Sequence, residues 1–514
     1  MLDPRTPVLV GVGQSAERLD DPDYQRLSAV QLAAAAARAA LADTGADPQA
    51  IAESIDVVAG VRQFEISVPG AETPLGRSDN FPRSVASRLG AKPRRAVLEV
   101  TGGQSPQHLV NEFAAAIAAG EAGVVLLAGG EAISTIEAYA GEADRPDFTE
   151  HVDGDLEDRG YGLDGMVSMT LMAHGLADMP AQYALLENAR RARLGLSRPA
   201  CAAAMGALFA PFTAVAAANP FAAAPTIRDA TELATAGEAN RPIADPYTRY
   251  LVARDKVNQG AAVLLMPLSD AERLGVPEDR RIFLAGHADL RERDLMERPD
   301  LGSSPAAAAA ARQALAVAGI GTDDLRTIDL YSCFPIAVFA VADALGLTAG
   351  DPRGLTVTGG LPFFGGPGNN YSMHAIVSTV QRLRGTPGFG FVGANGGSMT
   401  KYSAGVYTTT PVAWAAGDSA GVQASLDAVP VVTEAEEADG PATIETYTVK
   451  YGREGRRRGI VVGRLDDGRR FVAKGPAGFL ADPATEPIGA RVRVRSTGLT
   501  NEVTVPVADT PGTV

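Results

Sequence analysis

The sequence predicts a duplicated α/β protein in which helices cover both faces of its sheets, with an inserted helical region and a small C-terminal β-barrel. Three observations lead to this prediction. Two segments recur in the same order, apolar strands alternate with helices over most of the chain, and the composition changes after residue 418. Segments that recur in order indicate a duplicated unit, and one site can lie where the two copies meet.

The repeat can be followed residue by residue. In one segment, Leu98, Val100, Thr101, Gly102, Gly103, His108 and Gly129-Gly130 return as Leu355, Val357, Thr358, Gly359, Gly360, His374 and Gly396-Gly397. In the other, Arg38, Leu41, Gly45, Ile51, Ile55 and Asp56 return as Arg312, Leu315, Gly319, Leu325, Ile328 and Asp329. The two histidines are therefore 266 residues apart, and we expect them at equivalent points of two equivalent helices.

Residues 1–130 form the first half of the predicted duplication. We expect strands at 7–13, 55–61, 95–100 and 123–130, and helices at 27–44, 82–90 and 106–119. The strands are continuously apolar, which is typical of a sheet covered on both faces. Pro106 suits the first turn of its helix, with Ser105 as the expected N-cap.

Residues 131–245 interrupt the alternation, because they are rich in Gly, Pro, Met and acidic side chains and contain helical pieces. We interpret them as an inserted, mostly helical domain. The second half follows at residues 246–417. There we expect strands at 261–268, 281–288, 328–334, 388–397 and 403–409, and helices at 305–318 and 336–345.

Residues 418–514 differ from the rest of the chain in composition and charge. Five short strand-like segments follow an acidic run, which favours a small closed barrel of the oligomer-binding (OB) type. This segment holds 12 Lys/Arg and 14 Asp/Glu, so it is nearly neutral within a chain of net charge −15. The run Arg456-Arg457-Arg458 is interpreted as a solvated hairpin tip, because the surrounding charge does not favour nucleic-acid binding.

The bulk properties exclude several classes of protein. The N-terminus lacks a basic region followed by an apolar run, and we expect neither a signal peptide nor a membrane span. Two cysteines, Cys201 and Cys333, cannot form a disulfide framework, which favours a reducing, cytoplasmic location. The five histidines show no HxxxH spacing, so no metal is expected.

The duplicated core with its inserted region resembles the thiolase superfamily over residues 5–411, closest to the type associated with sterol carrier protein. Four passages carry the resemblance: IAAGEAGVVLLAGGEAIS, QGAAVLLM, ANPF and TVTGGLPFFGGPG. The resemblance implies a five-layered αβαβα core, and the terminal barrel resembles OB-fold modules that accompany thiolases. It also implies acyltransferase ancestry, a place in lipid metabolism, and CoA or acyl-CoA as a ligand, without a tightly bound cofactor.

The family's catalytic side chains are not found where the resemblance places them. The nucleophilic cysteine falls on Gly103, the histidine of the GHP motif on Gly366, and the second cysteine on Gly393. Tyr331, in the segment YSCF, stands where the family has Asn or His. Glycine cannot perform thiol chemistry, so we expect the inherited mechanism to be absent or rebuilt, as in a pseudoenzyme.

Three nearby side chains remain as catalytic candidates. Cys333 is either a relocated nucleophile with His374 as its base or a packed, inert thiol. His374 either faces the pocket or is a core histidine that pairs with His108. Tyr331 either donates a hydrogen bond to an oxyanion or fills the space left by the missing groups, and we favour filling.

The Gly-rich turns are the stronger binding candidates. Backbone N–H groups at a helix mouth bind an anion or a thioester oxygen without any side chain. The expected substrate-binding residues are Gly103, Gln104, Ser105, Gly366, Asn369, Asn370 and Gly393.

Three functions are compatible with these observations. The first is acyl transfer or carbon–carbon bond chemistry on acyl-CoA. The second is a catalytically silent acyl-CoA or fatty-acyl carrier, whose barrel docks partner enzymes of lipid metabolism. The third is a scaffold without CoA affinity. The strand before the first Gly-rich turn can pair into a homodimer, or an appended domain covers this edge and the protein is a monomer.

Overall fold

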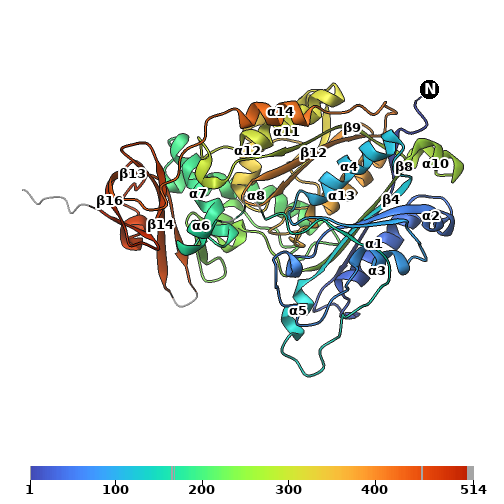
Figure 1. Cartoon of the computed structure of the whole chain (residues 1–514), viewed down its shortest axis with the longest axis horizontal. Coiled ribbons are helices and arrows are strands. Elements are labelled where there is room, and N and C mark those ends of the chain that lie inside the picture. Colours follow the sequence, from blue (N-terminus) through green and yellow to red (C-terminus); the bar gives the residue numbers. More distant parts are fainter. Residues whose placement is uncertain (1, 164–165, 167, 453–454, 506–514) are drawn as a thin grey trace, which may run out of the picture.

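The computed structural model describes residues 2–163, 166, 168–452 and 455–505 (Figure 1). Ten strands form one sheet in the order β10-β11-β12-β9-β1-β8-β4-β2-β3-β5. Strands β9 and β1 pair over only two residues each among the described residues, Val8 with Phe283 and Leu9 with Ile282. Two smaller sheets therefore meet edge to edge at this narrow junction.

The two sheets have the same strand order, which confirms the duplication. The first sheet contains β1 (Pro7–Glu17), β2 (Ile55–Gly60), β3 (Arg95–Leu98), β4 (Val124–Ala132) and β8 (Asn258–Pro267). The strand expected at 261–268 was predicted as part of the second half, but as β8 it lies in the first sheet, between β1 and β4. The second sheet contains β9 (Ile282–Arg291), β10 (Leu325–Leu330), β11 (Phe389–Gly396) and β12 (Lys401–Thr408). The order β1-β8-β4-β2 of the first sheet corresponds to β9-β12-β11-β10 of the second.

Five layers of secondary structure result from this arrangement (Figure 1). Helices α4 (Ser105–Ala119) and α13 (Tyr371–Gly385) lie between the two sheets and pack against each other and against strands of both halves. One outer layer consists of α1 (Ala29–Asp43), α2 (Pro48–Ser54) and α3 (Phe81–Ser87), and α10 (Leu268–Arg273) lies near it. The other consists of α11 (Pro305–Ala318), α12 (Pro335–Leu345) and α14 (Ser419–Asp427).

Local sequence signals set the ends of these helices. Helix α1 begins with a capping box in which Ser28 and Gln31 satisfy each other's backbone N–H groups. Its counterpart α11 begins at Ser304, whose side chain accepts from the Ala307 N–H, and ends at Gly319 in the left-handed region. The predicted strand at 328–334 ends at Leu330, so Tyr331 and Cys333 lie on a loop.

The inserted region is mostly helical, as predicted, and it also extends the first sheet. Its elements are α5 (Ile133–Tyr139), β5 (Glu157–Asp158), α6 (Met169–Ala173), α7 (Met179–Arg193), α8 (Arg198–Ala217), α9 (Ala230–Ala234), β6 (Pro242–Ala244) and β7 (Tyr247–Thr248). Strand β5 pairs in parallel with the outer edge of β3. Helix α8 is long and apolar enough to cross a membrane by length and composition alone. Its Met205, Leu208 and Phe209 are buried in the core, and core helices commonly pass this test.

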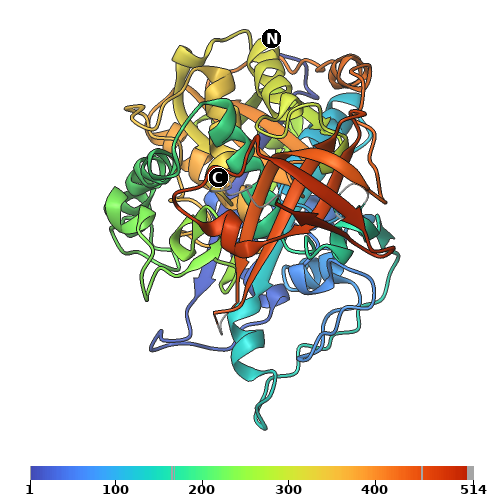
Figure 2. The ribbon, with the colours of Figure 1, turned by 90° about the vertical axis from the view of Figure 1, so that its left-hand side faces the viewer.

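The C-terminal segment forms the predicted five-stranded closed barrel (Figure 2). Its elements are β13 (Gly440–Tyr451), β14 (Arg457–Leu465), β15 (Arg470–Gly475), α15 (Ala477–Ala481), β16 (Arg491–Ser496) and β17 (Asn501–Thr504). Pairing of β13 with both β14 and β16 closes the barrel. The barrel is docked on the inserted region, because β13 also pairs with β6. The apolar alternation of TNEVTVPV (residues 500–507) predicts the last strand of the barrel, and residues 506–507 lie outside the described part.

Candidate functional site

The two central helices begin close together, and each rests on a glycine of the other half. Gln104 precedes α4, and a Cβ on Gly396 at the end of β11 would overlap its Oε1. Asn370 precedes α13, and a Cβ on Gly129 in β4 would overlap its amide. The repeat relates Gln104 to Asn370 and Gly396 to Gly129, so the structure preserves the duplication at the level of single contacts.

Asn369 ties these two helix starts together. Its Oδ1 accepts from the Gly102 N–H at 3.0 Å, and its Nδ2 donates to the Arg62 carbonyl at 2.9 Å and to Ser67 Oγ at 3.0 Å. Ser372 Oγ in turn donates to the carbonyl of Gly103 at 2.6 Å. The predicted binding residue Asn369 therefore holds the Gly-rich turn in place.

Gly103 lies at the mouth of α4 and faces Tyr331. A Cβ at position 103 would overlap the Tyr331 hydroxyl and would lie 2.6 Å from the carbonyl oxygen of Asn395. Burial, and secondarily the neighbouring Cys333, raises the pKa of the Tyr331 phenol. Tyr331 thus fills the space beside Gly103 as a neutral phenol, which is the interpretation favoured from the sequence.

The backbone N–H groups of Gly103 and Gln104 have no hydrogen-bond acceptor among the described residues, whereas the Ser105 N–H donates to the Gly102 carbonyl. Ser105 was expected to cap α4, and this prediction is wrong. It is the first helical residue, and its Oγ donates to the Val100 carbonyl at 2.9 Å. Gln104 occupies the N-cap position without a side-chain cap, so no capping side chain satisfies the N–H groups at the start of this helix.

Cys333 is buried among polar side chains that do not activate it. Burial raises the pKa of its thiol to about 12, although hydrogen bonds from Tyr183 and Asn395 oppose this shift. The Asn395 Nδ2 lies 3.7 Å from the sulfur and 2.7 Å from the Tyr183 hydroxyl. Among the described residues no hydrogen bond joins Cys333 to His374, so the expected nucleophile and base do not form a pair.

His374 and His108 occupy equivalent places but have different partners. His374 Nδ1 lies 2.6 Å from Oε1 of Gln14 in β1, its Nε2 has no partner, and burial lowers its pKa to about 3. His108 Nδ1 lies 3.1 Å from Oδ1 of Asp289 in β9. Burial opposes protonation of His108, but the hydrogen bond to Asp289 and the nearby acidic groups raise its pKa to about 9. One interpretation of the sequence paired His374 with His108. In the structure each histidine instead bonds to a strand of the opposite half.

The two other glycines of the expected catalytic set have different surroundings. The Gly366 N–H donates to the Arg254 carbonyl at 2.7 Å, and a Cβ there would lie 3.2 Å from that oxygen. A Cβ at Gly393 would overlap the Tyr402 hydroxyl, which is buried and has no partner. At positions 103 and 393, therefore, a tyrosine hydroxyl takes the place of a side chain.

Buried polar atoms without partners gather around the two helix starts, although buried polar groups are normally hydrogen-bonded. They include Gln104 Oε1, both amide atoms of Asn370, His374 Nε2, Gln259 Oε1, Asn395 Oδ1 and Tyr402 OH. These atoms offer hydrogen bonds to a polar ligand or to water. Gln259, Asn395 and Tyr402 were not identified from the sequence, since only the fold brings them to this place.

A buried carboxyl pair also escaped the sequence analysis. Burial raises the pKa of Glu131 well above its usual range, and Glu65 beside it adds to this shift. The Glu131 Oε1 accepts from the Phe64 N–H at 2.8 Å. Burial raises the pKa of Glu65 to about 7, while Arg77 opposes the shift. Burial therefore favours the protonated form of Glu131, which can donate a hydrogen bond.

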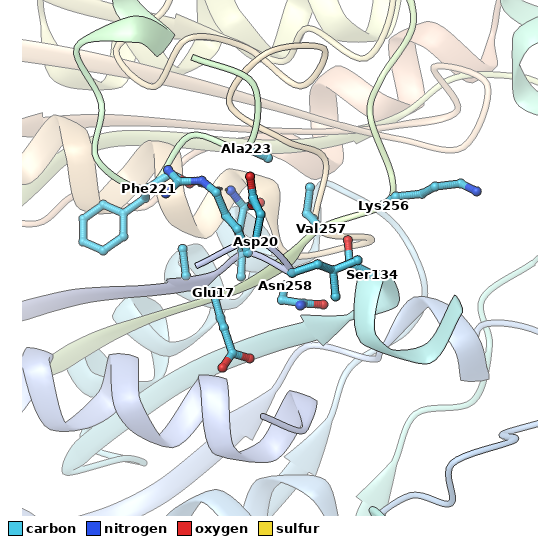
Figure 3. Close-up of a pocket in the computed structure, with 12 residues that line it drawn as sticks. Glu17, Asp20, Ser134, Phe221, Ala223, Lys256, Val257 and Asn258 are labelled. Carbon is cyan, nitrogen blue, oxygen red and sulfur yellow. Dashed lines mark hydrogen bonds between the residues drawn. The ribbon is translucent and has the colours of Figure 1, made fainter. Parts of the chain in front are cut away.

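A pocket of about 180 Å³ opens at the end of β1 and the start of β8 (Figure 3). It is lined by Ala16, Glu17, Arg18, Leu19, Asp20, Ser134, Phe221, Ala223, Lys256, Val257, Asn258 and Gln259. None of the predicted site residues lines it. Gln259 connects it to the core, because its Nε2 donates to the Phe364 carbonyl at 3.0 Å, in the loop that leads to Gly366.

Comparison with known proteins identifies the family. The family model of the thiolase-like protein type 1 additional C-terminal domain matches residues 421–499. The crystal structure of a monomeric SCP2-thiolase-like protein type 1 from Mycobacterium smegmatis is 48% identical in sequence. That match covers 98% of this chain and 100% of the relative, with a TM-score of 0.85. The chain belongs to the SCP2-thiolase-like proteins of type 1.

More distant structures share the fold of this SCP2-thiolase-like protein. The Ltp2-ChsH2(DUF35) aldolase matches 79% of the chain and 98% of its own, at 18% identity and a TM-score of 0.58. Acetyl-CoA acetyltransferase from Syntrophomonas wolfei matches 79% and 99%, at 18% identity and a TM-score of 0.54. A search of curated proteins finds no match. The resemblance to the thiolase superfamily, including the appended C-terminal domain, is thereby confirmed.

Proposed function

We propose that this SCP2-thiolase-like protein binds acyl-CoA thioesters at the mouth of α4 and does not use the thiol chemistry of thiolases. The observation that carries this proposal is the combination at Gly103: open backbone N–H groups beside a position filled by the Tyr331 hydroxyl. The N–H groups of Gly103 and Gln104 suit a thioester oxygen, as oxyanion-type donors do. The neighbouring unpartnered amide of Asn370 extends the polar lining.

The buried thiol argues against covalent catalysis. A nucleophilic cysteine requires the thiolate, which a nearby cation or a helix N-terminus stabilises. Cys333 has neither His374 nor another described cation as a partner, and its pKa is about 12. Glycines in place of the catalytic side chains are expected for a carrier in lipid metabolism and not for a conventional acyltransferase.

We also propose that the protein is a monomer, as the relative from M. smegmatis is described. Strand β5 covers the outer edge of β3, the strand that was a candidate for pairing in a homodimer. Arg159, next to β5, forms ion pairs with Glu99 at 2.5 Å and with Glu112 at 2.6 Å, which fastens the covering segment. A covered edge strand is not available to a second chain. The barrel likewise rests on its own inserted region, which leaves its remaining surface for partner enzymes.

Calorimetric titration with acetoacetyl-CoA tests the binding role, run beside a CoA-dependent assay of acetoacetyl-CoA consumption. We expect binding without turnover, unchanged in a Cys333→Ala variant. Slower hydrogen–deuterium exchange in residues 101–105 on ligand addition would locate the site. Turnover that disappears in Cys333→Ala would instead establish a relocated nucleophile, and absence of both binding and turnover would support the scaffold.

A further inference from the structure

A second concavity lies where the barrel meets the inserted region. Its volume is about 490 Å³, and it is separate from the elements of the thioester site. It is lined by Asp178, Arg241, Ile243, Lys450, Tyr451, Gly452, Arg456 and Arg458. Residues 241–243 supply one wall and residues 450–452, 456 and 458 the other, and Ala244 pairs with Lys450 beside them.

The lining is strongly cationic in a protein of net charge −15. Four basic side chains from three segments face one carboxylate, Asp178, which Lys450 already binds. Arg241 and Arg458 have no ion pair with a carboxylate among the described residues, and both are exposed. The groove therefore has at least two guanidinium groups available for an anion.

The strand register adds a second argument for an anionic ligand. Lys450 and Arg458 lie directly opposite each other on β13 and β14. Like charges at directly opposed positions destabilise a β-ladder, and Asp178 pairs with Lys450 but not with Arg458, so an anion beside Arg458 would offset the remaining repulsion. Arginine in particular presents parallel N–H groups that match the oxygens of a phosphate.

We propose that this groove binds the diphosphate portion of a nucleotide, with Arg241 and Arg458 holding the phosphates. Tyr451 and Ile243 supply an aromatic and aliphatic wall on which a planar base can pack. The volume lies within the range of small-molecule sites and is too small for a folded partner. Because the groove is lined by both the barrel and the inserted region, a bound nucleotide would also stabilise the contact between them.

Titration of the full-length protein with ADP tests the proposal, with inorganic pyrophosphate and adenosine as probes of the two parts. We expect ADP to bind more tightly than pyrophosphate, and adenosine to bind most weakly. Arg241→Gln and Arg458→Gln should each weaken ADP binding about tenfold, since each removes a charge-assisted hydrogen bond to a phosphate oxygen. Arg493→Gln, an exposed position on β16, is the matched control and should not change the affinity.

Four results would overturn the proposal. They are the absence of ADP binding, equal affinities for pyrophosphate and ADP, an equal loss in Arg493→Gln, and tighter binding of a poly-glutamate peptide or a single-stranded oligonucleotide. The test is independent of the thioester site, because Gly103→Ala should retain full affinity for ADP. Loss of ADP binding in Arg241→Gln and Arg458→Gln would assign the ADP to this groove, whatever the outcome at the thioester site.

Discussion

At the scale of single residues, the space beside Gly103 is already filled. The Tyr331 hydroxyl and the Asn395 carbonyl occupy the space that a Cβ on Gly103 would need, so a larger residue must displace one of them. Both neighbours are held in place, since Tyr331 packs edge-on against Tyr371 with ring centroids 5.3 Å apart and Asn395 lies in the ladder of β11 and β12. The glycine and the tyrosine are therefore two parts of one packing arrangement.

Substitution at Gly103 should consequently be costly without restoring thiolase activity. We expect Gly103→Cys and Gly103→Ala to lower the free energy of unfolding by about 1–3 kcal/mol, the usual cost of overpacking. The double variant Gly103→Ala/Tyr331→Ala should lose less stability than the sum of the two single changes. Thermal unfolding measures this, with Gly141→Ala, whose surroundings are open, as a control. A Gly103→Ala variant as stable as wild type would contradict the packing argument.

The buried thiols should react slowly in the native protein. With pKa values of about 12 for Cys333 and Cys201, roughly one thiol in 10⁴ is ionised at pH 8. We expect iodoacetamide to modify neither cysteine appreciably under native conditions and both of them after unfolding. Mass spectrometry of the alkylated peptides gives the extent at each position. Rapid native modification of Cys333 would indicate an activated thiol and would reopen the enzymatic role.

At the scale of elements, α4 and α13 are equivalent helices with opposite electrostatics. Asp289, opposite His108, is a carboxylate, whereas the equivalent partner of His374 is the amide of Gln14. The carboxylate of Asp289 stabilises the protonated form of His108. The Gln14 amide carries no charge, so burial alone determines the state of His374 and favours the neutral ring. A duplicated structure therefore contains one histidine that is charged at neutral pH and one that is not.

The two histidines should give the stability opposite dependences on pH. The pKa of His108 is raised to about 9, above the unfolded value of roughly 6.5, so its contribution is full below pH 6.5 and disappears as the pH rises through 9. The pKa of His374 is lowered to about 3, so protonation of the unfolded chain destabilises the protein as the pH falls from 6.5 toward 3. Melting temperatures from pH 4 to pH 10 report both effects.

Two variants separate these contributions. In His108→Gln, the melting temperature should no longer decline between pH 6.5 and 9. In His374→Gln, the melting temperature should fall less steeply between pH 6.5 and 3, and it should be lower than that of wild type at neutral pH. The acidic neighbours of His108 are Asp289, Glu99 and Glu112, and all three are retained in both variants. An unchanged pH profile in His108→Gln would show that its pair with Asp289 does not stabilise the fold.

The sequence predicted the elements of this fold better than it predicted the site. The barrel follows from the local pattern of apolar and polar residues, and the duplication follows from short segments that recur along the chain. Contacts such as Gln104 on Gly396 join positions far apart in the chain, so no local pattern contains them. Strand β5 was missed for a related reason, because its two exposed acidic residues, Glu157 and Asp158, have no apolar pattern and pair only where β3 offers an edge.

At the scale of the whole molecule, the barrel is joined to the body by buried polar contacts. Thr446 Oγ1 donates to the Leu185 carbonyl at 2.6 Å, and Asn188 Nδ2 donates to the Tyr447 carbonyl at 3.0 Å. Arg191, nearly inaccessible in α7, pairs with Glu486 at 2.6 Å. Directional contacts of this kind fix the barrel in one orientation, which keeps both walls of the cationic groove in register.

Arg470 should be the most sensitive of these connections. Its guanidinium is fully buried and donates to the carbonyls of Met296 and Arg298 at 2.9 and 2.6 Å, and it pairs with Glu445. Arg470→Met would leave the two carbonyls and Glu445 buried without their partner. Loss of one member of a buried ion pair lowers the free energy of unfolding by about 3–5 kcal/mol. We expect the barrel to unfold before the thiolase-like core in calorimetry, and proteolysis to occur within residues 428–439. Arg469→Met removes an exposed guanidinium paired with Asp467 and should behave as wild type. A single unshifted transition in Arg470→Met would show that apolar packing alone holds the barrel in place.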